Sequence, residues 1–159
     1  MFTKKLQVPR NPMPVGIGLI PIKTKGGRMG LLLVRRKIKP VGGLCLPGGY
    51  IDYGESWQQA ISREVLEEAC IETNPDDFEI FDVKSTHDNT KILIFGVSRI
   101  IYPESVLDNF EETNETCAAK IGCDIHMQLC FDLHQDVYEN WWCQSGQNSR
   151  IHYRYTTME

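Results

Sequence analysis

The chain has 159 residues, of which 42% are hydrophobic and 24% are charged, and its formal net charge at pH 7 is −4. This length and composition predict a single globular domain over residues 1–159. No stretch approaches 18 consecutive apolar residues, and the first six residues lack the apolar run of a signal peptide. We therefore expect a cytoplasmic protein without a membrane partner, whose six cysteines, which form no CxxC pair, are reduced thiols.

The N-terminal third of the sequence predicts strands. Three prolines indicate an extended segment over residues 1–14. Residues 15–22 are predicted as a strand, residues 25–28 as a hairpin turn and residues 29–36 as the returning strand. Residues 44–46 then lead into a Pro-Gly-Gly loop.

The remainder alternates helix and strand. A helix is expected to begin at Ser56, residues 74–77 break the chain, and strands are expected over residues 78–86 and 91–101. Apolar residues at spacings of four predict a second amphipathic helix near the end: Leu129, Leu133, Val137 and Trp141. The fold class predicted from this order is an α/β sandwich in which a mixed β-sheet lies between helices.

The first helix carries an unusual density of carboxylates. Glu64, Glu67 and Glu68 are three or four positions apart, so their side chains share one helix face. Like charges on such a face repel each other by a few tenths of a kcal/mol per pair, and a bound cation removes that repulsion. Hard oxygen ligands suit Mg²⁺ or Mn²⁺, which commonly hold substrate phosphates as well. The alternative interpretation is a solvated acidic helix.

Other positions of the same helix are predicted to have structural roles. Ile61 and Val65 lie on an apolar arc that can pack on a sheet. Arg63 lies outside both arcs, and its guanidinium can reach back to Glu55 in a charge-assisted, bidentate pair. We therefore expect Arg63 and Glu55 to brace the loop against the helix.

Residues 49–71 read GYIDYGESWQQAISREVLEEACI. This stretch resembles the Nudix box, G-x5-E-x7-R-E-U-x-E-E-x-G-U with U an aliphatic residue, and it matches at every fixed position but one. The preceding Leu46-Pro47-Gly48-Gly49 strengthens the resemblance. It implies a Nudix-type α/β/α sandwich and a hydrolase that cleaves a nucleoside diphosphate linked to another moiety, using Mg²⁺ or Mn²⁺ and attack of water on phosphorus.

The resemblance also implies roles for particular residues. Glu64, Glu67 and Glu68 would be the metal ligands, joined by a backbone carbonyl of Gly48 or Gly49, where the missing Cβ permits a close approach. A carboxylate must accept the proton of the attacking water. Glu64 and Glu67 are candidates for this base.

The resemblance also implies a second source for the base, because some relatives use a glutamate from a loop far downstream. The segment 109–115 follows the last predicted strand and contains Glu111, Glu112 and Glu115. Among these we favour Glu112 or Glu115. The alternative interpretation is a polar, solvated loop.

Cys70 is the position that departs from the family pattern, which has glycine there. Glycine suits a residue just past a helix because that residue often has φ > 0. A cysteine either adopts the left-handed conformation at a cost of about 1 kcal/mol, or the helix ends differently. We expect a slightly altered helix end and retained activity, and a non-hydrolysing member of the family is the alternative.

Charge is distributed unevenly, since every charged residue before Asp52 is a lysine or an arginine. Arg35, Arg36 and Lys37 lie between a predicted strand and the glycine loop, where cations can hold phosphates. A solvated strand edge is the alternative. The acidic balance of the chain argues against nucleic acid as a partner. Tyr53 is a candidate for stacking on a base.

Substrate identity does not follow from any motif after the box. ADP-ribose or another ADP-linked dinucleotide is the first expectation, on family frequency alone. The rival hypothesis is a nucleotide-binding sensor or regulatory domain that does not cleave its ligand. A small-molecule nucleotide is the expected partner in both, and a homodimer is left open.

Overall fold

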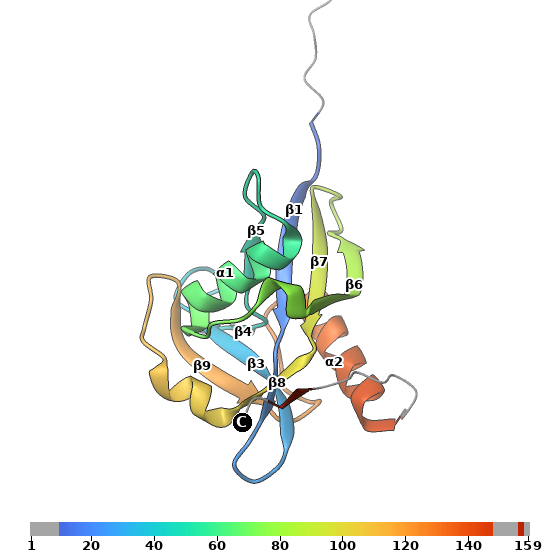
Figure 1. Cartoon of the computed structure of the whole chain (residues 1–159). Helices are drawn as coiled ribbons and strands as arrows, with labels where there is room; N and C mark the ends of the chain where they lie inside the picture. Colours follow the sequence, from blue (N-terminus) through green and yellow to red (C-terminus); the bar gives the residue numbers. More distant parts are fainter. Residues whose placement is uncertain (1–9, 148–155, 158–159) are drawn as a thin grey trace, which may run out of the picture.

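The computed structural model describes residues 10–147 and 156–157 (Figure 1). Residues 1–9 of the predicted extended segment lie outside the described residues, and the end of that segment belongs to the first strand. The helices are α1 (Trp57–Ala69) and α2 (Asp132–Gln147), with two 3-10 helices, η1 (Pro75–Asp77) and η2 (Glu104–Asn109). The strands are β1 (Met13–Leu19), β2 (Pro21–Lys23), β3 (Met29–Arg36), β4 (Leu44–Cys45), β5 (Gly48–Tyr50), β6 (Phe78–Ser85), β7 (Lys91–Ser98), β8 (Ile100–Pro103), β9 (Thr116–Gly122) and β10 (Thr156–Thr157).

These strands form two mixed sheets. One has the order β5-β1-β7-β6, in which β1 runs parallel to β7 and antiparallel to β5. The other has the order β10-β8-β2-β3-β4, with β9 pairing to β3. The predicted α/β fold with mixed strands between helices is confirmed, with the strands divided between two sheets.

Two of the predicted strands are each split at one residue, where the chain passes from one sheet to the other. The segment 15–22 divides at Ile20, because Pro21 has no N–H with which to continue the β1 ladder. The segment 91–101 divides at Arg99, whose N–H donates to the carbonyl of Asp77 at 2.9 Å.

The core has two halves, one under each helix. On β3, Leu31 and Leu33 pack in the cluster that includes Val137 and Trp141 of α2. The residues between and beyond them on β3 pack in the cluster that includes Ile61, Val65 and Ala69 of α1. Figure 1 shows α1 and α2 on different sides of the strands. This alternation is what a strand buried on both faces requires.

Glycines on the strands let α1 approach the sheet closely. A Cβ at Gly18 would lie 2.9 Å from Ile61 Cγ2, and one at Gly96 would lie 2.7 Å from both Ile61 Cδ1 and Trp57 Cζ3. Real Cβ contacts are not this short, so larger residues would push the helix outward. The carboxylates of α1 are thereby held at a fixed depth beside β1 and β5.

Both ends of α1 are defined by caps. Ser56 is the N-cap, and it forms a capping box with Gln59 through hydrogen bonds of 3.1 and 2.8 Å. At the other end Cys70 has φ 58° and ψ 30°, and its N–H donates to the carbonyl of Leu66 at 3.0 Å. Cys70 therefore adopts the left-handed conformation that this position asks of glycine.

The C-terminal part differs from the sequence prediction. A strand, β9, follows the acidic segment, so residues 109–115 do not come after the last strand. β9 pairs antiparallel with the buried β3, and this pairing overrides the weak β-propensity of its two alanines and lysine. The second helix begins at Asp132, after Leu129. Among the described residues, no helix is long and apolar enough to cross a membrane.

Candidate functional site

The carboxylates of α1 face the glycines of β5. Glu68 is buried, and its Oε2 accepts a hydrogen bond from the N–H of Gly48 at 2.9 Å. A Cβ at Gly49 would overlap the carboxylate of Glu64, so the missing Cβ lets that carboxylate lie directly against the strand. Glu67 lies on the same helix, but its side chain is 58% exposed. The structure thus brings Glu64 and Glu68 together with Gly48 and Gly49, and leaves Glu67 at the solvent edge.

Burial disfavours the ionised form of the carboxylates at this point. The pKa of Glu68 is raised to about 8, chiefly by burial and also by the carboxylates of Glu64 and Glu115, while the Gly48 N–H and the Arg36 guanidinium act in the opposite direction. Burial also raises the pKa of Glu64, against its hydrogen bond from Arg63. Carboxylates held in a desolvated place resist ionisation, and a divalent cation would relieve that cost.

The donor set is therefore chemically suited to Mg²⁺ or Mn²⁺. Within residues 10–147 and 156–157, no three His, Cys, Asp or Glu side chains are already gathered as a metal-binding group. Arg63 contacts both Glu64 and Glu67, and the Gly48 N–H contacts Glu68. These contacts hold the carboxylates in the metal-free protein.

Arg63 is the hub that fixes the loop after β5. Its Nε and Nη2 donate to the two carboxylate oxygens of Glu55 at 2.9 and 3.1 Å, which is a bidentate pair. Nη2 also donates to the carbonyl of Tyr50 at 2.9 Å, and Nη1 to Glu64 Oε1 at 2.7 Å. The hydrogen bonds from Arg63 hold the pKa of Glu55 below its usual range. This is the geometry that the predicted bracing role requires.

The acidic segment before β9 contributes one carboxylate to the site. Glu115 lies near enough to Glu64 and Glu68 for its charge to raise the pKa of both. Glu112 instead pairs with Lys37 Nζ at 2.8 Å. The backbone of this segment is fixed to β3, because the Lys37 N–H donates to the carbonyl of Glu115 at 2.7 Å.

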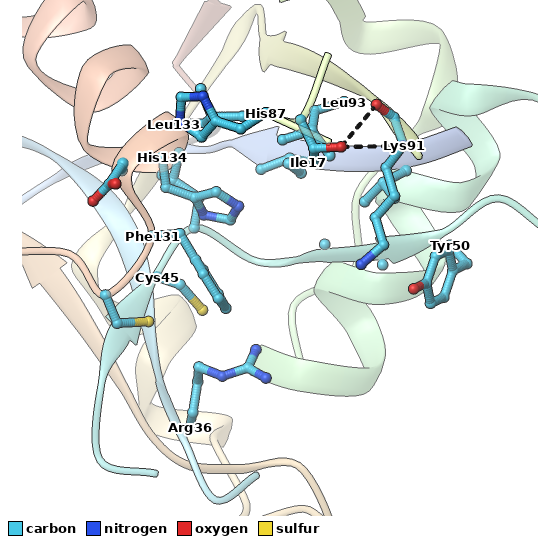
Figure 2. A pocket seen from close by; sticks show the side chains of 17 residues that line it. Ile17, Arg36, Cys45, Tyr50, His87, Lys91, Leu93, Phe131, Leu133 and His134 are labelled. Atoms are coloured by element: carbon cyan, nitrogen blue, oxygen red, sulfur yellow. Dashed lines mark hydrogen bonds between the residues drawn. The ribbon is translucent and has the colours of Figure 1, made fainter. Parts of the chain in front are cut away.

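A pocket of about 420 Å³ opens on the other side of Gly48 and Gly49 (Figure 2). The Arg36 guanidinium carbon lies 5.0 Å from the centre of the Phe131 ring, and Lys91 Nζ lies 5.6 Å from that of Tyr50. The pocket is lined by Val15, Ile17, Arg36, Cys45, Leu46, Gly48, Gly49, Tyr50, Thr86, His87, Lys91, Leu93, Cys130, Phe131, Asp132, Leu133 and His134.

Of the residues predicted to hold substrate, the structure places Arg36 in this pocket. Arg35 does not line it and donates to the carbonyl of Gly42. Lys37 pairs with the acidic segment, and Tyr53 is fully exposed outside the pocket. The other cation and the aromatic rings of the pocket come from β5, β7 and the residue just before α2, and no local sequence signal joins those segments.

His134 lines the pocket near Phe131 (Figure 2), and the centre of its ring lies 5.8 Å from that of Phe95 and 5.1 Å from that of Phe131. Its Nδ1 is buried without a hydrogen-bond partner among the described residues. Burial lowers the pKa of His134 to about 4, and the charge of Arg36 adds to this effect. The imidazole is therefore neutral at pH 7.

This depressed pKa predicts acid sensitivity. Below about pH 6.5 the unfolded chain binds a proton at His134 that the folded chain accepts only near pH 4, so the free energy of unfolding falls as pH is lowered through this window. We expect urea denaturation to show His134→Phe losing less stability between pH 6.5 and 4.5 than the parent protein, by about 2 kcal/mol. The exposed His126→Gln variant should keep the parent slope, and an equal slope in His134→Phe would contradict this assignment.

In this α/β sandwich, carboxylates of α1 thus lie against the glycines of β5, beside a pocket with cationic and aromatic side chains. Residues 12–120 match the NUDIX domain family. The match covers more than half of the chain, so this protein belongs to the NUDIX family.

Known proteins agree with this assignment. Over 68 residues the chain is 43% identical to putative nudix hydrolase 2 of Caenorhabditis elegans, covering 38% of this chain and 30% of that one. The chain thus spans less than a third of that relative's length. The fold is similar to that of a C. elegans Ap4A hydrolase in a binary complex, with TM-score 0.63, 18% identity and coverage of 81% and 96% of the two chains. It is also similar to the NUDIX domain of Shewanella oneidensis NrtR complexed with ADP ribose, with TM-score 0.63, 17% identity and coverage of 88% and 91%.

Proposed function

We propose that this protein is a metal-dependent hydrolase that cleaves the diphosphate linkage of a nucleoside diphosphate derivative by attack of water on phosphorus. The observation that carries the proposal is the position of two carboxylates, the largely buried Glu64 and the buried Glu68, against Gly48 and Gly49, two glycines that also line the pocket. Membership of the NUDIX family supports it. A cation held by these carboxylates and the glycine backbone would lie next to the pocket that would receive the phosphates.

Glu64, Glu67 and Glu68, with a backbone carbonyl of Gly48 or Gly49, would hold the Mg²⁺ or Mn²⁺ ion. When bound, the ion neutralises phosphate charge and makes water a better nucleophile. Glu67 is exposed and contacts Arg63 through one hydrogen bond of 3.3 Å, so its carboxylate is free to turn toward an ion. Arg63, held by Glu55, sets the position of Glu64.

Glu115 is the residue we propose as the base that accepts the proton of water. Its charge acts on Glu64 and Glu68, whereas Glu112 is paired with Lys37. Glu64 and Glu67 were the other candidates, and the Arg63 guanidinium contacts the carboxylates of both. A base must lie within reach of the attacking water, and Glu115 is a carboxylate from a separate segment whose charge acts on the proposed ligands.

The pocket suits the nucleoside part of the substrate. Arg36 and Lys91 can hold phosphate oxygens, and the faces of Tyr50 and Phe131 can receive a base. ADP-ribose or another ADP-linked dinucleotide is the substrate class we propose. The proteins of similar fold include a complex with ADP ribose and an Ap4A hydrolase, and these support the class by analogy of fold alone.

Arg36→Ala tests the pocket assignment. Loss of charge-assisted hydrogen bonds to phosphate is expected to raise KM by about 10-fold or more, with a smaller effect on kcat. Arg35→Ala is the matched control, because its guanidinium bonds to Gly42 outside the pocket. Steady-state kinetics on both variants, with folding checked by circular dichroism, would refute the assignment if their KM values rose equally or not at all.

A panel of nucleoside diphosphate derivatives, incubated with Mg²⁺ or Mn²⁺ and analysed by mass spectrometry, tests the activity itself. We expect cleavage at the diphosphate of at least one compound, abolished by EDTA. Ligand-induced thermal stabilisation without any metal-dependent product would refute hydrolysis and establish the rival function, a nucleotide-binding regulatory domain.

A further inference from the structure

We propose that Cys70 is a positioning residue, whose side chain holds the segment that carries Glu115 against the end of the metal-binding helix. This inference rests on the proposed function, in which Glu115 acts as the base. Cys70 is also the position at which the chain departs from the family's glycine, so the contact is a property of this chain.

The side chain of Cys70 bridges two parts of the chain that are 41 residues apart. Its Sγ accepts a hydrogen bond from the N–H of Glu111 at 3.5 Å and donates to the carbonyl of the same residue at 3.7 Å. Glycine has no atom that could make either contact. Cys70 has a left-handed backbone, with φ 58°, so the helix ends here. In this conformation the side chain points toward the acidic segment.

A second contact joins the acidic segment to the end of α1. Thr116, at the other end of the segment, is buried, and its Oγ1 donates to the carbonyl of Glu68 at 2.7 Å. Thr116 Oγ1 also lies 2.9 Å from Thr113 Oγ1 inside the segment. The acidic segment is thus tied at both ends to the last turn of α1, whose Glu68 belongs to the proposed ligand set.

The remaining tether of the segment runs to β3. Lys37 donates from its backbone N–H to the Glu115 carbonyl and from Nζ to the Thr113 carbonyl, at 2.7 and 2.9 Å. Lys37 fixes the segment relative to the sheet, whereas Cys70 and Thr116 fix it relative to the carboxylates. Without the helix contacts, Glu115 could shift relative to the ion while the fold stays intact.

Stability alone does not explain the cysteine. A left-handed conformation is less favourable for cysteine than for glycine, and thiol hydrogen bonds are weak. Glycine at this position would therefore stabilise the helix end. Catalysis responds to position more steeply, because displacement of a catalytic group by about 1 Å can slow a reaction by about 100-fold. The side chain is thus best accounted for by the placement of Glu115.

Cys70→Gly separates the effect of Cys70 on stability from its effect on catalysis, because glycine favours the helix end but cannot make the contact with Glu111. We expect an equal or higher melting temperature, a kcat lowered by about 10-fold and a KM within about twofold of the parent. Cys70→Ser, whose hydroxyl can bond to the Glu111 backbone, should recover most of the kcat. Thr116→Val should lower kcat like Cys70→Gly, and Thr116→Ser should retain it.

Hydrogen exchange provides a readout that does not need turnover. In Cys70→Gly, the amides of residues 110–116 should exchange faster than in the parent, while those of α1 before Glu68 should not change. Cys143→Ser, an exposed cysteine on α2, is the control and should alter neither exchange nor kcat. If Cys70→Gly leaves exchange in residues 110–116 unchanged, the tether does not exist. If exchange rises but kcat is unchanged in an active enzyme, the tether does not position the base. If no variant turns over any substrate, the proposed function fails, and exchange still decides whether the tether exists.

Discussion

Glu68→Gln is expected to lower metal-dependent turnover by at least about 100-fold while leaving the protein folded. The amide keeps an oxygen that can accept the N–H of Gly48, but it has no charge with which to bind a cation. Burial raises the pKa of Glu68 to about 8, so the ionised carboxylate is unfavourable in the metal-free protein. The variant should therefore melt at the same or a higher temperature than the parent. Steady-state kinetics and thermal denaturation, both without metal and with Mg²⁺, measure the two effects.

Glu72→Gln is the matched control for this prediction. Glu72 is an exposed glutamate just beyond α1, so the same change of charge occurs outside the site. We expect its turnover to stay within about twofold of the parent, and added Mg²⁺ to raise its melting temperature as in the parent. A Glu68→Gln variant that kept full turnover, or that was stabilised by Mg²⁺ as strongly as the parent, would remove Glu68 from the ligand set.

Arg63→Ala is expected to have the largest effect on stability, lowering the free energy of unfolding by about 2 to 4 kcal/mol. The guanidinium makes a bidentate pair with Glu55, a hydrogen bond to Glu64 and one to the carbonyl of Tyr50. Its removal leaves Glu64, which is mostly buried, without its opposite charge. Urea denaturation at pH 7 measures the loss.

Arg99→Ala provides the comparison for Arg63→Ala. Arg99 is more exposed, and its ion pairs with Asp77 and Glu79 are long, at 3.8 and 3.7 Å. Exposed pairs of this kind contribute about 0 to 1 kcal/mol. Equal losses for the two variants would show that the Arg63 contacts do not brace the loop more than a surface pair does.

The carboxylate face of α1 was predictable from sequence because its geometry is local. Glu64, Glu67 and Glu68 share a face through the helical repeat, and Arg63 reaches Glu55 over eight residues. The exposure of Glu67 was not predictable, because it depends on how deeply α1 is set between the sheets. That depth is fixed by glycines on β1 and β7, such as Gly18 and Gly96, that leave room for the helix.

The full set of pocket residues and the choice between the candidate bases could not be predicted from local sequence. Arg36 was predicted to hold substrate, but Lys91 and Phe131 join it only through strand pairing and the packing of α2. The sequence left Glu112 and Glu115 equivalent as bases. In the structure Lys37 pairs with Glu112, and the charge of Glu115 acts on Glu68, which supports our proposal of Glu115. Neither the pairing of Lys37 with Glu112 nor the position of Glu115 follows from a periodic pattern in the sequence.

Strand boundaries show the same limit. The run from Val15 to Ile22 was predicted as one strand, but Pro21 cannot continue the β1 ladder, and two sheets meet at Ile20. β9 has little β-propensity of its own and forms because β3 offers a buried partner. At Cys70 the expected alteration of the helix end was wrong, because the cysteine adopts the left-handed conformation that this position asks of glycine.

Turnover in H₂¹⁸O with Mg²⁺ tests the central claim most directly. Using the substrate found in the panel, we predict that mass spectrometry will detect one ¹⁸O atom in one phosphate-containing product per cleavage, as attack of water on phosphorus requires. Glu68→Gln should give no labelled product at the same enzyme concentration. Label in a product that contains no phosphorus, or labelled product formed equally by Glu68→Gln or in EDTA, would contradict a metal-dependent hydrolysis at this site.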